Sequence, residues 1–160
     1  MEERHEGVNE LADQAAVMEA SLVAVADSGI DIRHALFDRF FAAYPDRRKT
    51  FLNLEVSGVR MTDETVQMMF GLATDETWVC PLVAELTFTH RNYGALPMAE
   101  YDVFIDMTVE ELGTAAGDAW TPECAAAWSA QAERLKTMIA KAKTEWTEIM
   151  PGASTALSVA

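Results

Sequence analysis

The clearest helical pattern of the chain lies in residues 121–149, TPECAAAWSAQAERLKTMIAKAKTEWTEI. Thr121 is a good N-cap, and Pro122 suits the first helical position because the N–H that it lacks would have no partner there. Apolar residues then recur in alternating steps of four and three, which places them on one face of a helix. They are Trp128, Ala132, Leu135, Ile139, Ala142, Trp146 and Ile149. We expect one long amphipathic helix over this stretch.

The same spacing recurs upstream, in segments separated by glycine and proline. The segments are residues 11–25, 30–44, 61–73, 77–92 and 97–113. Pro45 is expected to begin a short helix, whereas residues 52–59 resemble a loop. No segment alternates with the period of two that marks a half-buried strand. We predict one all-α domain over residues 1–150, followed by a flexible C-terminal tail at residues 151–160.

Composition is typical of a globular single-domain protein. The chain has 160 residues, of which 50% are hydrophobic and 24% charged. Its net charge of −14 repels phosphate backbones and anionic lipid, so nucleic acid and membranes are poor partners. The first residues lack the apolar core of a signal peptide, and no segment is long enough to span a membrane. We therefore expect a cytoplasmic protein in which Cys80 and Cys124 are free thiols.

Common catalytic motifs are missing, which directs attention to the histidines. The sequence has no phosphate-binding glycine loop, dinucleotide fingerprint, paired-cysteine zinc spacing or HExxH motif. His5 and His34 are expected at the surface, but His90 lies late in a helix, four residues after Leu86. Metal ligation requires a neutral imidazole whose second nitrogen is held by an acceptor, and a helix carbonyl can serve. A histidine on an apolar face is also a common core residue, so the residues alone leave both interpretations open.

Three stretches carry a resemblance to the bacterial globins. Residues 32–51, IRHALFDRFFAAYPDRRKTF, resemble an aromatic-rich helix that leads to a proline and, six residues later, to a haem-stacking phenylalanine. Residues 80–94, CPLVAELTFTHRNYG, are similar to the proximal helix of flavohaemoglobin-like and neuroglobin-like globins, with leucine four before the ligand histidine and glycine four after it. Residues 120–128 resemble the start of the final globin helix.

The resemblance implies a globin fold of about seven to eight helices around a pocket for haem b. His90 would be the iron ligand and Phe51 would stack on the haem. Leu86, Leu96, Tyr101 and Phe104 would line the proximal side and the pocket floor. The distal side would contain Phe37, Met61 and Thr65.

The chain departs from the family pattern on both sides of the expected haem. Phe37 stands where a tyrosine is usual, and Met61 where a histidine or glutamine is usual, with Gly58 and Glu64 as alternatives to Met61. Tyr101 falls one residue late, and Lys143 falls where a glutamate is expected. The family's proximal charge relay is therefore not carried over.

The function that the resemblance implies is the binding of a diatomic gas, which is oxygen, nitric oxide or carbon monoxide. Nitric oxide dioxygenase activity would need a separate reductase, because no flavin or nicotinamide domain is encoded here, and we do not predict an enzyme. Tryptophan and methionine on helix faces leave room for a homodimer. The alternative is a globin-shaped sensor or interaction module that binds no haem.

A distal pocket of Phe37 and Met61 predicts weak oxygen binding. Neither side chain donates a hydrogen bond, and one lost donor of about 1–3 kcal/mol weakens binding roughly 5- to 150-fold. Stopped-flow mixing of the reduced, haem-loaded protein should show rapid oxygen dissociation. A slow off-rate would contradict the prediction.

Overall fold

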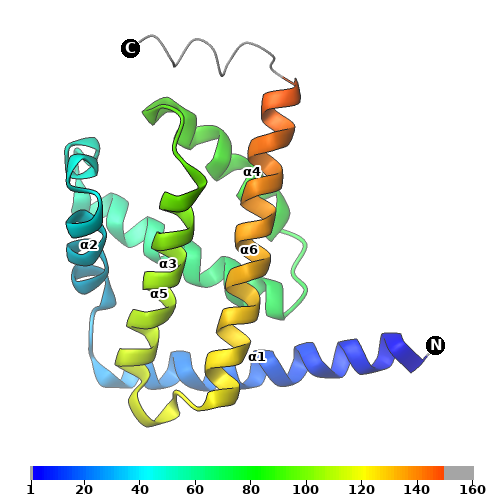
Figure 1. Ribbon diagram of the computed structural model, residues 1–160. Helices are drawn as coiled ribbons and strands as arrows, with labels where there is room; N and C mark the ends of the chain where they lie inside the picture. The colour runs from blue at the N-terminus through cyan, green and yellow to red at the C-terminus, as the bar shows by residue number, and fades with distance from the viewer. Residues whose placement is uncertain (1, 150–160) are drawn as a thin grey trace.

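The computed structural model describes residues 2–149, with side chains described at residue 7 and at residues 9–145. Every regular element in this part of the chain is a helix, which confirms the all-α prediction (Figure 1). The elements are α1 (Glu2–Ser28), α2 (Ile32–Ala43), η1 (Pro45–Thr50), α3 (Leu54–Ala73), α4 (Val79–His90), η2 (Arg91–Tyr93), α5 (Met98–Ala116), η3 (Gly117–Ala119) and α6 (Pro122–Ile149), where η denotes a 3₁₀ helix. The predicted tail at residues 151–160 lies outside the described residues.

Side-chain caps fix where the helices begin. The Thr121 hydroxyl accepts a hydrogen bond from the Cys124 amide at 3.1 Å, which confirms the predicted start of α6. The predicted loop over residues 52–59 is wrong, because α3 already begins at Leu54. Asn53 caps that helix by accepting from the Val56 amide at 3.3 Å, and Glu55 adds negative charge at its positive end.

The main core surrounds Trp128 of α6, at the crossing with α1. Figure 1 shows α1 running across the ends of α5 and α6. Trp128 is fully buried there, and its indole N–H donates to the Ser21 hydroxyl at 2.9 Å. Ser21 donates in turn to the Met18 carbonyl at 2.6 Å. Both polar groups in this buried contact are therefore satisfied.

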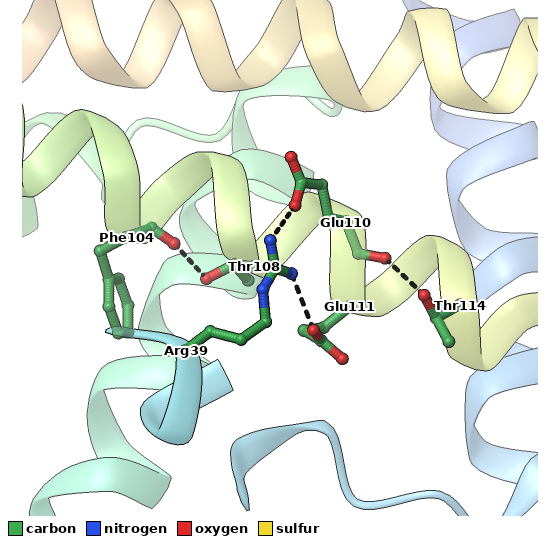
Figure 2. Close-up of polar contacts among 6 residues, drawn as sticks. All are labelled: Arg39, Phe104, Thr108, Glu110, Glu111 and Thr114. Atoms are coloured by element: carbon green, nitrogen blue, oxygen red, sulfur yellow. Dashed lines mark hydrogen bonds and ion pairs between the residues drawn. The ribbon is translucent and has the colours of Figure 1, made fainter. Parts of the chain in front are cut away.

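A second, aromatic cluster joins α2 to α5. Its buried members are Leu36, Phe37, Phe40, Phe41 and Phe104. Neighbouring rings meet at tilted or edge-on angles, with centroids 5.2–6.0 Å apart, which is the favoured arrangement for aromatic pairs. At the surface beside the cluster, Arg39 of α2 binds Glu111 at 2.8 Å and also binds Glu110, as Figure 2 shows. The two layers of contact fix α2 against α5.

None of the helices between residues 2 and 149 combines the length and the apolar character that crossing a bilayer requires.

Replacement of Ser21 tests the crossing of α1 and α6. In Ser21→Ala the buried indole N–H of Trp128 loses its acceptor, and the free energy of unfolding should fall by about 1–3 kcal/mol. Urea denaturation followed by tryptophan fluorescence measures this change. Ser129→Ala, at an exposed serine of α6, is the matched control and should change stability by less than about 0.5 kcal/mol. Equal effects of the two variants would contradict the assignment.

Candidate functional site

A cavity of about 540 Å³ opens between α3 and α4 and reaches α5 and α6 behind them. This volume lies within the range of about 300–1,000 Å³ that is usual for small-molecule sites. Its deeper wall is apolar, formed by Met68, Leu82, Ile105, Leu135 and Ile139 together with the residues discussed below. Such a lining favours a large apolar ligand, because burial of apolar area drives the binding.

The structure brings most of the predicted site residues together on this cavity. Those lining it are Phe51, Met61, Thr65, Leu86, His90, Leu96, Tyr101 and Phe104. Phe37 does not line it, because it packs behind two of these residues, with ring centroids 5.5 Å from both Phe51 and Phe104. It is only 3% exposed and belongs to the aromatic cluster.

His90 ends α4 with its imidazole held in one orientation. The Nδ1 atom lies 2.6 Å from the Leu86 carbonyl oxygen. A carbonyl can only accept, so Nδ1 carries a proton, and in the neutral imidazole Nε2 is then the nitrogen with the lone pair. Leu86 and His90 are four residues apart in the sequence, which is about one helical turn. The His90 side chain therefore bonds to the carbonyl one turn before it in the same helix. The arrangement meets one requirement for metal ligation, since the second ring nitrogen is held by an acceptor of the same helix.

Two tyrosines pack near the imidazole. The Tyr101 ring lies 5.7 Å from that of His90 at an angle of 55°, and the Tyr93 ring lies 6.4 Å away at 68°. Burial raises the pKa of Tyr101 to about 12, with a smaller contribution from Glu100. The phenol of Tyr101 is therefore neutral at physiological pH and offers an aromatic face beside His90.

Four charged residues of the cavity lining form two ion pairs. Arg47 of η1 binds Glu100 of α5 through two hydrogen bonds of 2.7 and 2.8 Å. Arg60 binds Glu64 within α3 at 2.7 Å. The hydrogen bonds that the arginines donate to these carboxylates raise the pKa of each arginine. The two pairs differ in burial, since the Arg47 side chain is 29% exposed and that of Arg60 is 67% exposed.

One face of α3 supplies the wall opposite α4. Its lining residues are Ser57, Arg60, Met61, Glu64, Thr65 and Met68. Ser57 and Arg60 were not predicted as site residues, although their spacing continues the helical pattern of Met61, Thr65 and Met68 back to residue 57. The mistaken loop over residues 52–59 concealed that signal. Thr65 donates its hydroxyl to the Met61 carbonyl at 2.7 Å, so this hydroxyl is already engaged.

The structure also shows where the two alternatives to Met61, Glu64 and Gly58, lie relative to the cavity. Glu64 lines the cavity, where it binds Arg60. Gly58 does not line it: a Cβ there would come within 3.2 Å of the Phe37 ring. Met69 is fully buried in the main core, whereas Met68 lines the cavity.

Within the described residues, no three His, Cys, Asp or Glu side chains come together to form a metal site. Comparisons with protein-family models, with curated proteins and with solved structures each found no match.

The two ion pairs should differ in their contribution to stability. Glu100→Gln removes a bidentate partner from a partly buried arginine and should lower the free energy of unfolding by about 1–2 kcal/mol. Glu64→Gln is the matched control, and its exposed partner predicts a loss below about 0.5 kcal/mol. Thermal and urea unfolding of the ligand-free protein compare the two. A larger loss for Glu64→Gln would contradict the difference in burial.

Proposed function

We propose that this chain is a globin-type haem protein that binds a diatomic gas. The observation that carries the proposal is the hydrogen bond of 2.6 Å from His90 Nδ1 to the Leu86 carbonyl, in a side chain that lines the cavity. It leaves Nε2 as a ligand for iron on a rigid helix. The globin fold itself is part of the proposal, supported by the all-helical architecture and by the cavity between α3 and α4.

The cavity residues fit haem b in polarity. Phe51, Met61, Leu86, Leu96 and Phe104 offer apolar contacts to the porphyrin, in a cavity of about 540 Å³. When bound, haem would supply an iron that can take oxygen, nitric oxide or carbon monoxide. His90 would hold it from α4, and α3 would face the gas with Ser57, Met61 and Thr65.

The arginines of the cavity lining fit the carboxylates of haem. Arg47 and Arg60 both lie on the lining, and guanidinium groups bind carboxylates with one or two hydrogen bonds. Arg47 is bound to Glu100 and Arg60 to Glu64. To bind a haem carboxylate, each arginine would have to leave its glutamate or bind both carboxylates at once. These two residues are therefore the ones that we assign to the propionates.

The gas-binding side would be poor in hydrogen-bond donors. Met61 has none, and Phe37 packs behind the cavity wall. Ser57 also lines the cavity and carries a hydroxyl group. The prediction of weak oxygen binding from the sequence did not take this hydroxyl into account. Gas binding or sensing in the cytoplasm requires no further cofactor, whereas dioxygenase turnover would require a separate reductase.

Haem titration of variants tests the proposal. The wild-type protein should take up one haem and show a Soret band that shifts with carbon monoxide. His90→Ala should bind haem at least about tenfold more weakly, by analogy with the losses caused at supporting positions, and added imidazole should restore the band. His34→Ala is the control, because His34 is 72% exposed on α2. A His90→Ala protein that loads like the wild type would refute the ligand, and a wild type without a band would favour the haem-free module.

A further inference from the structure

Lys143 of α6 reaches the segment that carries His90 and Tyr101. Its ammonium donates a hydrogen bond to the Leu96 carbonyl, in the connection between η2 and α5. The same nitrogen lies 5.0 Å from the centroid of the Tyr101 ring. Tyr101 in turn packs against His90, with ring centroids 5.7 Å apart. A continuous series of contacts therefore joins an α6 cation to the imidazole.

This lysine is placed at an energetic cost. Burial lowers its pKa, and the nearby Glu100 offsets only part of that effect. Glu100 is itself bound by Arg47 at 2.7 and 2.8 Å. The contacts that repay the desolvation include a carbonyl dipole and the negative face of an aromatic ring.

We propose that Lys143 is a positioning residue for the haem ligand, one that fixes Leu96 and Tyr101 beside His90 and places a positive charge one ring away from the imidazole. The inference rests on the proposed haem site. A ferric centre carries one more positive charge than a ferrous one, so a nearby cation favours the ferrous state.

Redox titration of haem-loaded variants tests this role. Lys143→Met removes the charge and the donor, and Lys143→Gln removes the charge but keeps a donor for the Leu96 carbonyl. At a fixed ambient potential, both should lower the ratio of ferrous to ferric protein by about tenfold, the order expected for one partly buried unit charge. Lys143→Arg should stay near the wild-type ratio. Lys141→Met is the matched control, because Lys141 is 76% exposed on the same helix and should leave the ratio unchanged.

The outcomes separate this inference from the function on which it rests. The inference is supported if the ratio of ferrous to ferric protein falls in both neutral variants and stays near the wild-type value in Lys143→Arg. If one neutral variant does not fold, the other gives the same comparison. Neutral variants with the wild-type ratio, or a Lys141→Met shift of equal size, would overturn it while haem binding stands. A wild-type protein that takes up no haem would instead refute the proposed function.

Discussion

The Leu86 carbonyl is the group on which the geometry of the cavity wall depends. It lies in the last turn of α4, where the helix dipole makes carbonyl oxygens strong acceptors. It accepts from the His90 ring at 2.6 Å and from the Thr89 hydroxyl at 3.1 Å. One backbone atom of the same helix thereby orients the imidazole and determines that Nδ1 carries a proton. The packing of α4 against α3 and α6 then determines where the imidazole lies in the cavity.

The aromatic cluster is a second constraint on the cavity, because some of its rings also form part of the cavity wall. Phe51 and Phe104 belong both to the cavity lining and to the packing of α2 on α5. Their contacts with Phe37, at 5.5 Å each, stiffen the wall from behind. A change in the packing of α2 would therefore alter the cavity, although Phe37 never reaches it. Core stability and cavity shape are coupled through shared rings.

Sequence patterns predicted the local features of this structure well. The cap at Thr121 and the spacing of Leu86 and His90 involve hydrogen bonds over three or four residues, so both could be found by counting. The start of α3 could also have been found from Asn53 and Glu55, because a cap and an acidic first turn are local signals. That single error concealed Ser57 and Arg60 as lining residues.

Contacts between distant segments could not be predicted in this way. The burial of Phe37 behind Phe51 is set by the angle at which α2 meets α5, which no local spacing encodes. Arg47 meets Glu100 across 53 residues, and Lys143 meets Leu96 across 47. In a chain of net charge −14, any of many carboxylates could have paired with Arg47. Only the packed helices select the partner.

The difference between the two arginine pairs also bears on how a ligand with carboxylates would enter. Arg47 is held by two hydrogen bonds in a partly buried setting, whereas Arg60 is exposed and bound through a single atom pair. Release of Glu64 from Arg60 costs little, because exposed ion pairs contribute at most about 1 kcal/mol. Release of Glu100 would leave a less exposed carboxylate without its partner, and Glu100 is only 12% exposed. An incoming carboxylate would therefore engage Arg60 first, and Arg47 would keep Glu100 while it takes a second acceptor through its remaining N–H groups.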